Sequence, residues 1–136
     1  MLIRIGAQLF PRQKPDFRLL YVGQDQLWFA ALRKFLAKPQ FHIVYCPDRS
    51  SAIRFLKGDP KYHLLMFDLE PQEPTALELI GLARSLPHRE QLPIVIVTGE
   101  QPDRSRDFAR QTGATECLSK TGDVSVAAEA INRLLL

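Results

Sequence analysis

The sequence predicts an α/β fold in which a five-stranded parallel sheet is covered by helices on both faces. Short apolar runs alternate five times with segments of helical periodicity, beginning at Phe17, and this is the pattern of a doubly wound sheet. The runs at 19–22, 64–67 and 94–97 are apolar almost throughout. Because a strand with two buried faces shows no polar alternation, we expect these three runs at the centre of the sheet.

Five strands are expected along the chain, each followed by a helix. The expected strands are Phe17–Val22, 41–45, 63–67, 93–97 and Glu116–Ser119. The run at 41–45 contains His42 and is the better candidate for an edge strand, and Glu116–Ser119 is a short fifth strand.

The helices are delimited by capping and breaking residues. The first ends before Pro39, and its expected inward stripe comprises Leu27, Trp28, Ala31, Leu32, Phe35 and Leu36. The second follows the capping residue Asp48 and closes at 58–60, and the third carries apolar residues at 77, 80, 83 and 86 before Pro87. The fourth, at 101–112, is polar and ends at Gly113, which predicts a loosely anchored element. The expected core stripe of the fifth comprises Val124, Ala127, Ala128, Ile131, Leu134 and Leu135.

Length and composition favour one domain at 17–136, preceded by an extension at 1–16. The chain has 136 residues, of which 46% are hydrophobic and 24% charged, which suits a single packed core. The formal charge of +3 comes from Lys and Arg residues scattered along the chain. Nucleic-acid interfaces cluster such residues, so we expect neither nucleic-acid binding nor a second domain.

The amino-terminal segment is expected to be a tail rather than a membrane anchor. Its apolar residues are interrupted by Arg4, and Pro11 and Pro15 argue against regular structure in its second half. A strand added to the open sheet edge is the alternative. Two cysteines, Cys46 and Cys117, suit a reducing compartment, and we expect a cytoplasmic protein.

Three polar side chains stand where expected strands end. Asp68 follows the third strand, Thr98 the fourth and Lys120 the fifth. Each has an ordinary alternative: a capping residue for Asp68, a β-branched strand residue for Thr98 and a solvated lysine for Lys120. Because the carboxyl ends of parallel strands line one crevice, we expect an acid, a hydroxyl and an amine to meet there.

With this order of residues, the segment from Phe17 to Leu136 resembles the receiver domain of bacterial response regulators. Leu77-Glu-Leu79 beyond the acid, the run 93–98 ending in Thr98, and Gly113-Ala114 with Lys120 also match that family's pattern. The resemblance implies a flavodoxin-like strand order, 2-1-3-4-5, which places the two cysteines on opposite edge strands. It implies that Asp68 is the phosphoacceptor, that Thr98 senses the phosphoryl group and that Lys120 binds it.

The resemblance also implies a Mg²⁺ site, and here the chain departs from the family. The acidic pair that ends the first strand in receivers is Gly23-Gln24. The remaining candidate ligands are Asp68 and the backbone carbonyl of Glu70. Asp25 is a further candidate through a shifted loop, as are the side chains of Glu70 and Glu100, with capping of the first helix as the ordinary role of Asp25. We therefore expect Mg²⁺ binding and Mg²⁺-dependent phosphorylation to be weak or lost.

Other departures concern the direction of the Lys120 side chain, the residue in the fifth strand and the loop after Asp68. Thr121 follows Lys120 where receivers usually have proline, which predicts a different direction for Lys120. Cys117 stands at the position that often carries an aromatic switch, and the proline pattern at 71–76 predicts a stiffer loop after Asp68. The sequence lacks other common site patterns. The three histidines do not have metal-ligand spacing, and we find neither a glycine-rich phosphate loop nor a hydrolase triad.

Two functions remain open. The first is a receiver in two-component or phosphorelay signalling that accepts a phosphoryl group at Asp68 from a histidine kinase or phosphotransfer protein. The second is a pseudo-receiver that acts as an interaction or dimerisation module without phosphorylation. A flavodoxin-like site for another anionic ligand is a weaker third. Neither main function is that of an enzyme beyond the domain's own phosphorylation and dephosphorylation.

The expected output is association with another protein. The fourth helix, fifth strand and fifth helix are the expected homodimer surface, where Val126 and Ala130 lie outside the core stripe. No effector domain is expected after Leu136, so the signal passes by association or within a longer parent protein.

Overall fold

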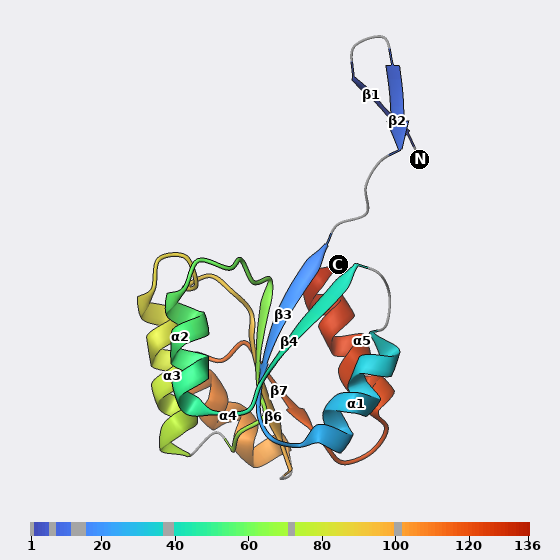
Figure 1. The fold of residues 1–136 in the computed structure, drawn as a ribbon. Coiled ribbons are helices and arrows are strands. Elements are labelled where there is room, and N and C mark those ends of the chain that lie inside the picture. The colour runs from blue at the N-terminus through green and yellow to red at the C-terminus, as the bar shows by residue number, and fades with distance from the viewer. Residues whose placement is uncertain (1, 6–7, 12–15, 37–39, 71–72, 100–101) are drawn as a thin grey trace.

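A parallel sheet with its strands in the order β4-β3-β5-β6-β7 forms the centre of the computed structural model (Figure 1). The model describes residues 2–5, 8–11, 16–36, 40–70, 73–99 and 102–136. The five strands are β3 (Phe17–Val22), β4 (Phe41–Cys46), β5 (Leu64–Phe67), β6 (Ile94–Thr98) and β7 (Glu116–Ser119). Counted from β3 this is the order 2-1-3-4-5, so the predicted sheet is confirmed.

Helices cover both faces of the sheet. Figure 1 shows α1 (Gln26–Phe35) and α5 (Val124–Leu135) on one side, and α2 (Arg49–Lys57), α3 (Pro74–Ser85) and α4 (Pro102–Thr112) on the other. Two apolar clusters fill the two layers: Leu20, Leu65 and Ile96 of the sheet belong to one, and Leu19, Met66 and Val97 to the other. Among the described residues, no helix is long and apolar enough to cross a membrane.

The local sequence explains where the helices begin and end. Asp25, Asp48 and Asp123 precede α1, α2 and α5, and each side chain accepts a hydrogen bond from a backbone N–H of the first turn. These contacts satisfy donors that a helix leaves free at its start. Gly113 follows α4 with φ +105, a conformation that side-chain-bearing residues rarely adopt.

The inward stripe of α1 differs from the prediction. Leu27 is 87% exposed and Phe35 is 50% exposed, whereas Phe29, which was not assigned to the stripe, is buried. The cause is aromatic packing, because the Phe29 ring lies 4.7 Å from that of Tyr21 and 5.0 Å from that of Tyr45. Seating Phe29 there turns the helix so that Leu27 faces solvent.

Helix α5 corrects a second expectation. Ala130 is buried rather than part of a surface patch, while Val126 is exposed as expected. Three of the four buried α5 residues are alanines. Their small side chains let the helix lie close to its neighbours, and the close approach covers Ala130 as well.

The amino-terminal segment contains regular structure. Strands β1 (Leu2–Ile5) and β2 (Gln8–Pro11) pair antiparallel as a hairpin that lies apart from the α/β domain in Figure 1. The expectation of irregular structure in the second half of this segment is therefore wrong for β2. Pro11 is compatible with the strand because it is the last residue of β2, where a missing backbone donor is tolerated.

Two cysteines occupy opposite edge strands, as the strand order implied. Cys46 ends β4 and Cys117 lies in β7; both are buried and free. A disulfide between them is excluded by this placement.

Two arginines hold the connections at the amino-terminal end of the sheet. Arg89 is 1% exposed, and its guanidinium donates to the carbonyl oxygens of Leu56, Phe55 and Gly58 at the end of α2. Arg84 donates to the carbonyl oxygens of Gly113, Glu90 and Leu92. Each arginine thus supplies hydrogen-bond donors to several carbonyl groups. The chain segments that carry these groups are not paired with one another by backbone hydrogen bonds of the sheet.

We expect Arg89→Met to lower the free energy of unfolding by about 3 kcal/mol, because three carbonyl groups lose their donor in a buried place. Arg49→Met is the matched control. Arg49 pairs with Glu78 through a half-exposed salt bridge, and such a surface pair contributes little to stability. Urea unfolding followed by circular dichroism measures both. Equal losses would contradict the structural role of Arg89.

Candidate functional site

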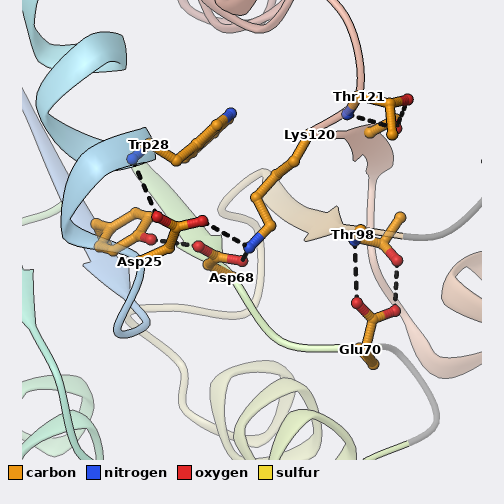
Figure 2. A network of polar contacts seen from close by, with 10 residues as sticks. Asp25, Trp28, Asp68, Glu70, Thr98, Lys120 and Thr121 are labelled. Atoms are coloured by element: carbon orange, nitrogen blue, oxygen red, sulfur yellow. Dashed lines mark hydrogen bonds and ion pairs between the residues drawn. The ribbon is translucent and has the colours of Figure 1, made fainter.

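The strand register brings the predicted residues to one edge of the sheet. Phe67 pairs with Val22, and the Asp68 backbone N–H donates to the Val22 carbonyl at 2.8 Å. On the other side of β6, the Lys120 backbone N–H donates to the Thr98 carbonyl at 2.8 Å. Asp68, Thr98 and Lys120 therefore share the carboxyl edge, as predicted (Figure 2).

Asp68 and Lys120 form an ion pair. Lys120 Nζ lies 2.8 Å from Asp68 Oδ1, and the exposed fractions of the two side chains are 24% and 4%. The described chain contains no cis peptide bond, so Lys120 reaches the carboxylate with a trans bond to Thr121. The different direction expected for Lys120 is not observed.

Asp25 joins this pair from the start of α1. Its Oδ1 accepts from the Trp28 backbone N–H at 3.0 Å, which is the capping role expected of it. Its Oδ2 lies 3.2 Å from Lys120 Nζ, so the same carboxylate also reaches into the site. Figure 2 shows Lys120 extended between Asp25 and Asp68. Two carboxylates thus share one ammonium group, and the three side chains carry a net negative charge.

Tyr21 is the residue that the sequence did not reveal as part of this site. It lies in β3, it is 1% exposed, and its hydroxyl donates a short hydrogen bond to Asp68 Oδ2. With Lys120 at Oδ1, both oxygens of the Asp68 carboxylate are engaged. A signal was present in the sequence, since a tyrosine within an apolar run needs a partner for its hydroxyl once buried.

Gly23 lies against Asp68 and Tyr21. A Cβ atom at this position would be 2.6 Å from Asp68 Cβ and 3.0 Å from the Tyr21 hydroxyl oxygen. Such contacts are far inside van der Waals distance. The backbone at Gly23 therefore has no room for a side chain in this arrangement, and this is the position where receivers carry an acid.

Thr98 and Glu70 form a second contact group. Thr98 Oγ1 donates to Glu70 Oε2 at 2.5 Å, and the Gly99 backbone N–H donates to Glu70 Oε1 at 3.0 Å. Figure 2 shows the Glu70 carboxylate facing Thr98 rather than Lys120. Glu70, expected to contribute its carbonyl group to a metal, thus also binds the hydroxyl group expected to sense a phosphoryl group.

Burial and charge shift several pKa values at the site. Burial raises the pKa of Tyr21 most, and the hydrogen bond to Asp68 and the Asp68 charge raise it further. Burial alone would lower the pKa of Lys120, but hydrogen bonds and charges from Asp68 and Asp25 outweigh it and raise the value. The Trp28 backbone hydrogen bond, and then Lys120, lower the pKa of Asp25 despite partial burial.

Comparison with known proteins gives relatives in sequence and in structure. No protein-family model matches the chain. An uncharacterized 14.6 kDa protein in the sodA1 3′ region of Leptolyngbya boryana is 30% identical over 106 residues, covering 77% of this chain and 79% of that protein. Stress response regulator protein 1 of Meyerozyma guilliermondii is 27% identical over 96 residues, covering 69% of this chain and 44% of that protein. The chain thus spans less than half the length of the second relative.

Solved structures of similar fold identify the domain type. A response regulator from Thermotoga maritima superposes with a TM-score of 0.75 at 18% identity, covering 88% of this chain and 98% of that one. A response regulator protein from Burkholderia multivorans superposes with a TM-score of 0.68 at 25% identity, covering 88% and 94%. The chain has the fold of a response-regulator receiver domain. The receiver resemblance inferred from the strand-end residues is thereby confirmed.

The side chains of this receiver domain do not fit a Mg²⁺ ion. Gly23 and Gln24 supply no carboxylate, and Gln24 Nε2 donates to the Pro47 carbonyl at 3.0 Å. The candidate ligands have other partners. The carboxylates of Asp68 and Asp25 contact Tyr21 and Lys120, and the Glu70 carbonyl accepts from the Glu73 backbone N–H at 2.9 Å. Glu100 lies outside the described residues. Across the described part of the chain, no group of three or more His, Cys, Asp or Glu side chains is placed to hold a metal ion. The Lys120 ammonium group lies between the two carboxylates, 2.8 Å from Asp68 Oδ1 and 3.2 Å from Asp25 Oδ2.

We expect Gly23→Ala to destabilise the receiver domain by about 2 kcal/mol, because the new methyl group overlaps Asp68. Gly81→Ala in α3 is the matched control. A Cβ atom there meets nothing within 4 Å, so it should stabilise the helix by about 0.8 kcal/mol. Thermal and urea unfolding measure both changes, and a neutral Gly23→Ala would contradict the tight packing at Asp68.

We expect the stability of the domain to fall above pH 10. The Tyr21 pKa is raised above its ordinary value of 10.0, so the unfolded chain loses this proton first and the stabilisation is full below pH 10 and declines above it. Lys120 contributes in the same direction. Urea unfolding between pH 8 and 11 should show a flatter decline in Tyr21→Phe. Tyr62→Phe is the control, since burial raises the pKa of Tyr62 as well but Asp68 does not contribute there. An equal flattening would contradict the Asp68 contribution.

Proposed function

We propose that the chain acts as a receiver domain in two-component or phosphorelay signal transduction, with Mg²⁺-dependent phosphorylation of Asp68 weak or lost. The observation that carries the proposal is the state of the Asp68 carboxylate. It stands at the phosphoacceptor position and is paired with Lys120, while Gly23 and Gln24 replace the acidic pair. The expected partner is a histidine kinase or a phosphotransfer protein, and the expected location is the cytoplasm.

The charge balance supports weak phosphorylation. In the transfer, an Asp68 oxygen forms a bond to phosphorus as the bond to the donor breaks, and anions approach one another. Positive charge must offset this repulsion in the transition state. Lys120 supplies one cation, but Asp25 Oδ2 lies 3.2 Å from its Nζ and takes part of that charge. Without a metal, the remaining positive charge is small.

The space beside Asp68 supports access for a donor. A hollow of about 440 Å³ extends from Asp68 and Gly23 to Arg49 and Thr75. Arg49 borders it but pairs with Glu78. A phosphohistidine protein that brings its own positive charge could place its donor group in this hollow.

A second candidate function is a pseudo-receiver, an interaction module that works without phosphorylation. The full engagement of Asp68 by Lys120 and Tyr21 favours it, as does the engagement of Thr98 by Glu70. Its output surface is expected on α4, β7 and α5, where Val126 is 62% exposed and is suited to homodimer contact. The expected role is signalling, without enzymatic activity beyond the domain's own phosphorylation and dephosphorylation, and without nucleic-acid or membrane binding.

Incubation with acetyl phosphate, followed by intact mass measurement, separates the two functions. We expect little or no phosphoryl adduct, whether Mg²⁺ is added or chelated, because a single shared ammonium group stabilises the transition state poorly. Asp68→Ala is the control for modification elsewhere. A Mg²⁺-dependent adduct that approaches one per chain and disappears in Asp68→Ala would contradict weak phosphorylation. An Asp68-dependent adduct with a phosphohistidine protein alone would support the receiver function over the pseudo-receiver.

A further inference from the structure

We propose that Tyr21 is a positioning residue that takes the place of the metal anchor at Asp68 and connects Asp68 to the first turn of α1. The proposal rests on the proposed function only in treating Asp68 as the position at which the domain receives its signal. Three features of the structure carry it: the space at Gly23, the hydrogen bonds of Asp68 and the aromatic contacts of Tyr21.

The space at Gly23 is too tight for an acidic residue unless the Tyr21 ring moves. A Cβ atom at Gly23 would lie 3.0 Å from the Tyr21 hydroxyl oxygen and 3.1 Å from Tyr21 Cζ. An aspartate at 23 needs this volume for its side chain. Tyr21 and Gly23 therefore belong together. In this chain the neutral Tyr21 hydroxyl group takes the place of the carboxylate and the bound cation of other receivers.

The hydrogen bond gives Tyr21 the anchoring role. Its hydroxyl donates to Asp68 Oδ2, and Lys120 Nζ lies at Oδ1. A metal ion that ligates Asp68 would have to share a carboxylate oxygen with one of these donors. Because the carboxylate is nearly buried, a fixed donor at each oxygen holds its orientation as a bound cation would.

The aromatic contacts extend the connection to α1 and β4. The Tyr21 ring lies 4.7 Å from that of Phe29, 5.7 Å from that of Tyr45 and 6.3 Å from that of Trp28. Trp28 is also the residue whose backbone N–H is bound by Asp25, and Asp25 contacts Lys120. Two paths, one through rings and one through charges, thus lead from Asp68 to the same turn of α1.

Trp28, the single tryptophan of the chain, reports on this connection by its fluorescence. We expect Asp68→Asn to change Trp28 emission in the otherwise unchanged chain, because the charge that holds the Tyr21 hydroxyl is lost. In a Tyr21→Phe background, the same substitution should lose most of its effect. Tyr62→Phe is the matched background, since Tyr62 is a buried tyrosine in the apolar cluster on the other face of the sheet. The full effect should persist there.

Magnesium titration tests the anchoring role with the same probe. Gln24→Asp returns one acid to the family's pair without touching Gly23. We expect Tyr21→Phe/Gln24→Asp to show a saturable Mg²⁺ response at constant ionic strength, while Tyr62→Phe/Gln24→Asp does not respond. Circular dichroism confirms that each variant is folded.

Two results would overturn the proposal. One is an Asp68→Asn effect on Trp28 of equal size in the Tyr21→Phe and Tyr62→Phe backgrounds. The other is an equal Mg²⁺ response, or equal silence, in the two Gln24→Asp double variants. Neither result depends on a phosphodonor, so failure here is distinct from failure of the proposed function. Asp68 phosphorylation in the unchanged chain would leave both comparisons interpretable.

Discussion

A carboxylate that is almost completely removed from water sets the arrangement of the whole carboxyl edge. The Asp68 side chain is 4% exposed, and an unpaired charge in such a place would cost several kcal/mol, on the order of 3–5. Lys120 and Tyr21 meet this requirement from strand ends on either side of β5. Gly23 follows from it, because the backbone must pass close to the acid and the phenol. The absence of the acidic pair therefore agrees with the close packing of Gly23 against Asp68 and Tyr21 and is not an isolated loss.

Asp25 links this charge requirement to helix formation. One carboxylate oxygen caps α1 and the other faces Lys120, so the same side chain stabilises a helix start and competes for the cation that a phosphoryl group needs. The shared ammonium group explains why retention of aspartate, threonine and lysine does not by itself indicate a working phosphorylation site. Charge at the site depends on neighbours as much as on these three residues.

The sheet and the meeting of Asp68 with Lys120 could be predicted from the sequence, because apolar periodicity and strand ends are local features. The strand order came from the resemblance to receiver domains. Tyr21 could not be assigned, because in sequence it is one more member of a buried run, and its partner is 47 positions away. The exposure of Leu27 and the burial of Ala130 depend on how each helix is rotated, which the Tyr21–Phe29 contact and the small alanines decide. The second role of Asp25 required the position of Lys120, which only the fold supplies. The β2 strand depends on pairing with β1, which proline positions alone did not indicate.

Two arginines, Arg84 and Arg89, make the two ends of the sheet different. Arg89 binds carbonyl groups at the end of α2, and Arg84 binds carbonyl groups in the connections that lead into β6 and β7. These bonds make the amino-terminal end of the sheet a rigid base, since moving any one segment breaks contacts with several others. We therefore expect conformational change at the opposite end, where the helices begin and the side chains of Glu70, Asp25 and Lys120 contact the loops. A signal received at Asp68 would then move the amino-terminal ends of the helices while their carboxyl-terminal ends stay fixed.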